Sequence, residues 1–138
     1  RDKQIQFNAE IIPPSEKVNV LCDPRRIGQV LANLIKNSVD FVPDKGGRIT
    51  IRTEAGYSKQ TNDGNSNYVV FTIEDNGSGI PFEKIINLFK KFYQVDTSTK
   101  RKHGGTGLGL ALVAKIVDAM PNEKLSCTRA NACIASMV

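Results

Sequence analysis

Two glycine-rich segments carry the clearest chemical signal in this sequence. The first covers residues 75–80 (Asp-Asn-Gly-Ser-Gly-Ile), and the second covers residues 104–110 (Gly-Gly-Thr-Gly-Leu-Gly-Leu). Glycine allows the backbone to bring its N–H groups against a ligand and to adopt positive φ angles. Because an aspartate heads the first segment and an apolar stretch follows the second, the pair indicates a nucleotide site, with adenine at the first segment and phosphates at the second.

Asp75 stands at the end of a predicted strand, directly before the first glycine segment. A carboxylate only accepts hydrogen bonds, so it suits the exocyclic amine of adenine, whereas guanine presents an acceptor at that edge. An Asp-Asn-Gly sequence is also common in an ordinary turn that ends a strand. Taken alone, Asp75 leaves both interpretations open.

The second glycine segment precedes an apolar stretch, 108–120, that is predicted to be a helix. The unpaired N–H groups at a helix start and the positive end of the helix dipole attract anions such as phosphate. The segment lacks the Gly-Lys-Ser/Thr ending of a P-loop and does not follow a strand as a Rossmann fingerprint does. The alternative interpretation is a flexible linker ahead of a core helix.

Three carboxamides, Gln29, Asn33 and Asn37, stand four residues apart and therefore share one face of a predicted helix. Amide oxygens aligned in this way suit contact with Mg²⁺ and phosphate. Mg²⁺ takes only about one or two protein ligands and leaves the other positions to phosphate and water. The alternative interpretation is a polar helix face exposed to solvent.

The composition is that of one soluble globular domain: 138 residues, a net charge of +5, 40% hydrophobic and 24% charged residues. No apolar run approaches the roughly 20 residues that span a bilayer, so we expect a cytoplasmic domain, with any membrane anchor elsewhere in a full-length protein. Cys22, Cys127 and Cys133 lack metal-type spacing and are expected to be reduced thiols. His103 is the only histidine, which excludes most histidine-based metal and triad chemistry.

Lys100, Arg101 and Lys102 form the densest run of positive charge. Charge runs are usually solvated or disordered. This run lies between the predicted nucleotide-binding segments, so the alternative is a set of cations that close over phosphates. Nucleic-acid binding would rest on the net charge alone, because no aromatic or motif pattern supports it.

The elements that must position these residues alternate unevenly and include one hairpin, which predicts a two-layer α/β sandwich. Asp23 is a suitable N-cap for the first helix, with Pro24 in its first turn. The expected elements are extended pieces within 5–20, a helix over 23–39, strands over 49–54 and 68–74 joined by a polar loop over 56–67, a helical stretch over 82–92, a loop over 94–105, a helix over 108–120, and two weakly patterned strands within 124–138.

Four motifs in this order resemble the ATP-binding catalytic domain of sensor histidine kinases, which shares a superfamily with DNA gyrase B, Hsp90 and MutL. The resemblance covers about residues 18–120. It implies a Bergerat-type ATP-binding fold, an α+β two-layer sandwich in which a mixed, mostly antiparallel sheet carries helices on one face. The motifs are the N box at 23–37, the first glycine box at 75–80, the phenylalanine box at 89–96 and the second glycine box at 105–110.

The resemblance also implies a role for each matching residue. Asn37 would hold Mg²⁺, Asn33 would contact phosphate or the shell of the metal, and Phe41 would line the adenine that Asp75 selects. The first glycine box would approach the nucleotide closely at Gly77, Gly79 and Ile80. The second would cradle the phosphates at Gly105, Thr106, Gly107, Leu108 and Gly109. Residues 94–104 would form a lid in which Lys100, Arg101 and Lys102 neutralise charge on the transferred phosphoryl group.

The function implied by the resemblance is that of an ATP-dependent protein histidine kinase domain. It would use Mg-ATP and transfer the γ-phosphoryl group to a histidine on a separate dimerisation and phosphoacceptor domain, with a response regulator downstream. His103 lies in the predicted lid and is not expected to be the acceptor. The domain itself is expected to contact neither nucleic acid nor a membrane. An ATPase clamp of the gyrase, Hsp90 or MutL type is the less favoured alternative, because Asn33 stands where those proteins have a water-activating Glu.

Two departures from the family pattern favour a third possibility, a degenerate nucleotide-binding or interaction module without turnover. Asp40 stands where many family members have Lys or Arg, so a cation expected near the phosphates is missing there. The segment 121–138 lacks the usual glycine pair and glycine-rich hairpin. The chain as a whole, 1–138, is expected to form one catalytic domain with an atypical C-terminal part.

Overall fold

The computed structural model describes residues 2–12, 22–58, 66–88, 90–91, 109–119, 123–128 and 132–137. The elements in these ranges follow the order strand, helix, hairpin, two helices and a second pair of strands. In chain order they are β1 (Ile5–Ile12), α1 (Pro24–Phe41), β2 (Gly47–Ser58), β3 (Ser66–Asp75), α2 (Phe82–Ile85), α4 (Gly109–Ala119), β4 (Glu123–Thr128) and β5 (Ala132–Met137).

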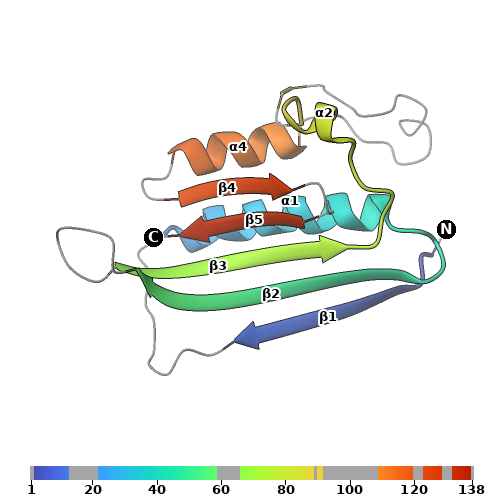
Figure 1. Cartoon of the computed structure of the whole chain (residues 1–138), viewed down its shortest axis with the longest axis horizontal. Coiled ribbons are helices and arrows are strands. Elements are labelled where there is room, and N and C mark those ends of the chain that lie inside the picture. Colours follow the sequence, from blue (N-terminus) through green and yellow to red (C-terminus); the bar gives the residue numbers. More distant parts are fainter. Residues whose placement is uncertain are drawn as a thin grey trace.

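Within the described ranges, five strands form one sheet in the order β1-β2-β3-β5-β4. β1 pairs with β2 in parallel, and the other three pairings are antiparallel. The helices α1 and α4 run along the sheet and share one hydrophobic core with it (Figure 1). The arrangement confirms the predicted two-layer sandwich with a mixed, mostly antiparallel sheet.

The core lies between these two helices and the strands β2 and β3. Ile49 and Ile73 enter it from the sheet and are 0% and 2% exposed. Val30 and Leu34 of α1, together with Val113 of α4, close over them. Since Val30 and Leu34 are four residues apart, they fall on one stripe of the helix. Burial of each such side chain contributes about 1.5–3 kcal/mol, so the core fixes α1 to the sheet.

The β2–β3 hairpin is longer than the sequence predicts. The polar composition of residues 56–67 predicts a loop, but Gly56 pairs with Tyr68 and Ser58 pairs with Ser66. The prediction is therefore wrong at both ends of this segment. Pairing with a neighbouring strand outweighs the weak intrinsic preference of polar residues for loops.

The helices agree with the predicted ones in place but not always in length. α1 continues to Phe41, beyond the predicted end near Val39. α2 forms only the first part of the helical stretch predicted over 82–92, whereas α4 matches the prediction closely. The predicted loop over 94–105 lies outside the described residues. No helix in the described ranges is both long and apolar enough to cross a membrane.

The C-terminal strands, for which the sequence pattern is weak, are present as β4 and β5. β5 pairs with β3, with Cys133 opposite Ile73, and β4 adds the outermost strand on that side. The atypical segment 121–138 therefore supplies two strands to the sheet. The place of these two strands in the sheet is set by the pairing of β5 with β3. The composition of the segment does not reveal that pairing.

The opposite edge of the sheet is β1. Arg52 of β2 stands opposite Glu10, and its Nε atom donates a hydrogen bond to the Oε2 atom of Glu10 at 2.9 Å. This hydrogen bond, and then the negative charge of Glu10, raise the pKa of Arg52 above its ordinary value. Both side chains remain partly exposed. Surface pairs of this kind contribute little stability, so the pair mainly supports the register of the parallel strands.

Candidate functional site

Helix α1 presents the predicted carboxamides, and its start is fixed as the sequence predicts. The Oδ1 atom of Asp23 accepts hydrogen bonds from the backbone N–H groups of Arg25 at 2.9 Å and Arg26 at 3.3 Å. Pro24 occupies the first helical position, where the lack of an N–H group carries no cost. The prediction that Asp23 and Pro24 begin this helix is confirmed.

Asn33 faces the start of α4. Its Nδ2 atom donates a hydrogen bond to the carbonyl oxygen of Gln29 at 2.9 Å, which fixes the orientation of the amide. Its Oδ1 atom lies 3.4 Å from the position that a Cβ atom on Gly109 would occupy. The structure thus brings together the middle of α1 and the last glycine of the second glycine segment.

Asn37 lies one helical turn beyond Asn33 on the same face of α1, because the two residues are four positions apart. Its side chain is half-buried, as is that of Asn33. No group of three or more His, Cys, Asp or Glu side chains that could hold a metal ion occurs in the described part of the chain. Amide oxygens on this face fit Mg²⁺, which accepts few protein ligands when phosphates supply the others.

The first glycine segment packs against the C-terminal end of α1. A Cβ atom on Gly77 would lie 2.9 Å from the carbonyl oxygen of Phe41, so only a glycine fits there without a shift of the backbone. The N–H group of Gly77 donates a hydrogen bond to the Oδ1 atom of Asp75 at 2.8 Å. Phe41 as a whole residue is 41% exposed, and its carbonyl lies against the loop that carries Asp75 and Gly77.

The remaining described residues of this segment extend the loop toward α2. Gly79 has a φ angle of +74°, a conformation that favours glycine. Ile80 is half-buried and follows it directly. The loop can therefore turn sharply just beyond its contact with α1.

Asn76 anchors this loop, and the sequence interpretation did not assign it a role. Its Oδ1 atom accepts a hydrogen bond from the Arg48 N–H group at 2.7 Å, and its Nδ2 atom donates one to the carbonyl oxygen of Gly46 at 2.9 Å. Its own N–H group donates to the Arg48 carbonyl at 3.2 Å. These contacts tie the end of β3 to the start of β2. The sequence did offer one indication of this role. Asparagine side chains often form hydrogen bonds to the backbone in turns, and Asn76 directly follows Asp75 at the end of the strand.

The side chain of Asp40 forms an ion pair with a lysine on the same helix. The Nζ atom of Lys36 lies 2.8 Å from the Oδ2 atom of Asp40, one turn along α1. The negative charge that departs from the family pattern is thus matched by a cation on the same helix.

The structure brings the described site residues together in two clusters along α1. Asn33 with Gly109, and Phe41 with Gly77 and Asp75, form the two clusters that the structure brings together, one near the middle of α1 and one at its end. The predicted residues outside the described ranges are Lys100, Arg101, Lys102, Gly105, Thr106, Gly107 and Leu108. Their roles stay predictions.

Similarity to known proteins covers most of this chain. Residues 22–132 match the family described as "Histidine kinase-, DNA gyrase B-, and HSP90-like ATPase". The chain is 37% identical over 118 residues to sensor protein kinase WalK of Staphylococcus haemolyticus, which is 85% of this chain and 18% of WalK. It is 40% identical over 96 residues to the circadian input-output histidine kinase CikA of Synechococcus elongatus, which is 70% of this chain and 11% of CikA. This chain therefore spans about a fifth or less of these relatives.

Solved structures of similar fold include the catalytic domain of histidine kinase ThkA, with a TM-score of 0.71 and 27% identity. That alignment covers 96% of this chain and 78% of the ThkA chain. Full-length ShkA in complex with AMPPNP aligns with a TM-score of 0.65 at 24% identity, over 96% of this chain and 24% of that one. The latter likeness supports the fold.

Proposed function

Since this chain belongs to the family of histidine kinase-, DNA gyrase B- and HSP90-like ATPases, and its curated relatives include sensor histidine kinases, we propose that it binds Mg-ATP and transfers the γ-phosphoryl group to a histidine on a separate domain. One observation carries the proposal: α1 faces both glycine segments. Asn33 lies against Gly109, and Phe41 lies against Gly77. Eight residues of helix separate these two contacts by about 12 Å, so the helix can serve as one wall for an extended nucleotide.

The end of this wall that carries Phe41 is the proposed adenine subsite. Asp75 accepts the exocyclic amine of the base, and the bond from Gly77 holds its carboxylate in place. The exposed Phe41 ring lines the base. An acceptor-only group at this edge favours adenine over guanine.

The middle of the wall is the proposed phosphate subsite. Asn37 holds Mg²⁺, and Asn33, oriented by its bond to Gln29, contacts phosphate or the water shell of the metal. Bound Mg²⁺ neutralises negative charge on the phosphate oxygens. Gly105, Gly107 and Gly109 offer backbone N–H groups at the start of α4, where the helix dipole favours anions.

Phosphoryl transfer depends mainly on positioning and charge neutralisation, so the site needs no general base of its own. Asn33 cannot activate water, which favours transfer to a protein side chain over an ATPase clamp. Lys100, Arg101 and Lys102 are the proposed cations of the lid. The acceptor histidine belongs to a dimerisation domain, and a response regulator then receives the phosphoryl group; the site of action is cytoplasmic.

The proposal is tested by nucleotide binding with a matched pair of variants. We expect Mg²⁺-dependent binding of ATP in clear preference to GTP. Asp75→Asn should weaken ATP binding about tenfold to a hundredfold, because a hydrogen bond to a charged acceptor is lost. Glu74→Gln removes the same charge from the adjacent, exposed position of β3 and should change nothing. Equal affinity for ATP and GTP, or equal effects of the two variants, would contradict the assignment of Asp75.

A non-catalytic nucleotide-binding module is the second candidate, favoured by Asp40. Position 40 is a carboxylate that pairs with Lys36, so it supplies no cation to the phosphate subsite. Radiolabelled ATP and a separately added histidine acceptor domain distinguish the two candidates. Phosphorylation of the acceptor that disappears in Asn37→Ala supports the kinase, whereas tight Mg-ATP binding without transfer supports the module.

A further inference from the structure

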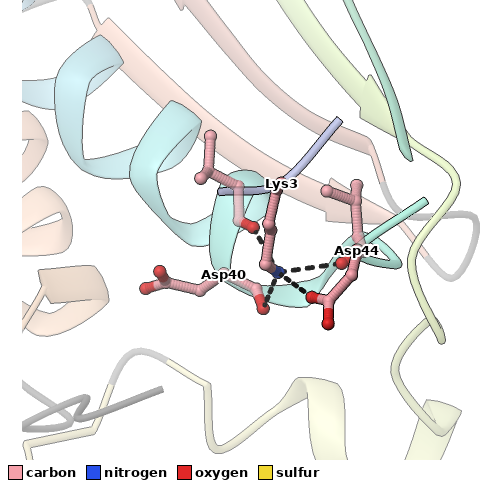
Figure 2. A network of polar contacts seen from close by, with 5 residues as sticks. Lys3, Asp40 and Asp44 are labelled. Carbon is pink, nitrogen blue, oxygen red and sulfur yellow. Dashed lines mark hydrogen bonds and ion pairs between the residues drawn. The ribbon is translucent and has the colours of Figure 1, made fainter. Parts of the chain in front are cut away.

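The C-terminal end of α1 is held by a lysine from the first residues of the chain. The Nζ atom of Lys3 donates hydrogen bonds to the carbonyl oxygens of Val39 at 2.8 Å, Asp40 at 2.9 Å and Val42 at 2.9 Å. It also lies 4.0 Å from the Oδ1 atom of Asp44. Figure 2 shows the ammonium group at the centre of these oxygens. An ammonium has three N–H donors, and three carbonyls receive them.

These contacts meet a need that the helix does not meet locally. The last four carbonyls of a helix have no partner within it, and the negative end of the dipole favours a nearby cation. The last turn of α1 contains no basic residue. Lys3 supplies the positive charge from 36 positions away in the sequence, and its side chain is only 17% exposed, so water competes weakly for the same carbonyls.

The backbone around Lys3 keeps it in place. The N–H group of Gln4 donates to the carbonyl oxygen of Asp44 at 2.9 Å. From Ile5 onward the chain pairs with β2, beginning opposite Gly47. The segment that carries Lys3 therefore contacts the end of α1, the turn that follows it and the start of β2.

We propose that Lys3 is a positioning residue for the nucleotide site, acting through the end of α1. Phe41 stands between Asp40 and Val42, two of the residues whose carbonyls Lys3 holds, and its own carbonyl lies against Gly77. Without Lys3, three carbonyls at a partly buried helix end lose their donor. The last turn then loosens, and the Phe41 ring and the Gly77 loop lose their common position. This inference rests on the proposed function, which places adenine at Phe41.

The first test compares the two ends of α1. Lys3→Met removes the donors at one end while it keeps most of the length of the side chain, and Asp23→Ala removes the cap at the other end. Both variants should lower the melting temperature. At a temperature where circular dichroism shows both fully folded, Lys3→Met should weaken Mg-ATP binding about tenfold, whereas Asp23→Ala should bind as the unsubstituted protein does. Lys3→Arg, which keeps the charge and several donors, should recover most of the affinity.

A second readout does not depend on nucleotide. The chain contains no tryptophan, so a Phe41→Trp variant carries a single tryptophan, whose emission reports on the end of α1. In this background, adding Lys3→Met should shift the tryptophan emission to longer wavelength, because the indole becomes more solvated, and adding Asp23→Ala should not. If Lys3→Met does not fold, Lys3→Gln, which keeps a neutral donor, replaces it in both measurements.

The outcomes separate the two proposals. Unchanged emission together with unchanged ATP affinity in folded Lys3→Met overturns the role of Lys3. Loss of affinity equal to that of Asp23→Ala also overturns it, since both changes then act only through stability. If the unsubstituted protein binds no ATP, the proposed function fails, while the emission shift still decides whether Lys3 positions residue 41.

Discussion

The two ends of helix α1 satisfy the same chemical requirement in different ways. At the N-terminal end, Asp23 accepts hydrogen bonds from residues two and three positions further along the chain. At the C-terminal end, Lys3, which lies 36 to 39 positions away in the sequence, donates to three carbonyls. The end that depends on a distant residue is the one that carries Phe41. The comparison indicates that local residues specify the start of the helix, whereas a tertiary contact secures the end that carries Phe41, the residue proposed to line the base.

The largest effect is expected from the same glycine substitution made near each end. Gly77→Ala places a Cβ atom 2.9 Å from the Phe41 carbonyl oxygen, so the loop must move, and overpacking of this kind costs about 1–3 kcal/mol. Gly28→Ala meets no atom within 4 Å and removes a flexible residue from a helix, which should stabilise the protein by about 0.5–1 kcal/mol. Chemical denaturation measures both free energies of unfolding.

Binding sharpens the same comparison. Gly77→Ala should also weaken Mg-ATP binding, because the loop leaves the end of α1, whereas Gly28→Ala should leave binding unchanged. A stable Gly77→Ala variant with undiminished affinity would show that the close approach of the loop to Phe41 is not needed for the site.

A smaller effect is expected from the local ion pair near the C-terminal end. Lys36→Gln should lower the free energy of unfolding by about 0.3–0.5 kcal/mol, the usual contribution of an exposed pair four residues apart on a helix. Urea denaturation at low and high salt measures it, and the difference from the unsubstituted protein should shrink as salt screens the charges. An effect as large as that of Lys3→Met, or one that is indifferent to salt, would mean that this pair rather than Lys3 secures the last turn.

The smallest effect is the coupling between the two caps. Asp23 and the residues held by Lys3 are separated by most of the length of α1, so Asp23→Ala and Lys3→Met should destabilise additively to within about 0.5 kcal/mol. A double-mutant cycle of unfolding free energies measures the difference. A coupling well above that value would show that the two ends of the helix do not act independently.

The sequence predicted those features whose causes lie close together in the chain. The start of α1 followed from Asp23 and Pro24, and the fold followed from the order of the motifs. The clustering of Phe41 with Gly77, and of Asn33 with Gly109, agrees with the predicted site, although the roles of these residues remain predictions.

What the sequence did not reveal depends on contacts between distant segments. Lys3 became a helix cap only because β1 folds back beside the turn that follows α1. Asn76 anchors its loop only because Gly46 and Arg48, at the start of the neighbouring strand β2, lie beside it. The extent of the β2–β3 hairpin was misjudged for the same reason, since polar residues became strand once a partner strand lay beside them. The conformational preference of a residue does not indicate which distant segment will lie beside it in the fold.

The parallel pairing of β1 with β2 has a consequence for the order of folding. Lys3 is held beside the end of α1 by the pairing of β1 with β2, two strands that the helix connects. Contacts between residues so far apart in the sequence form slowly, because closing the loop between them costs conformational entropy. The beginning of α1 needs only its own neighbours. We therefore expect the helix to become ordered at its N-terminal end first and to be completed at its C-terminal end only when the sheet has assembled, so that the end carrying Phe41 matures together with the tertiary fold.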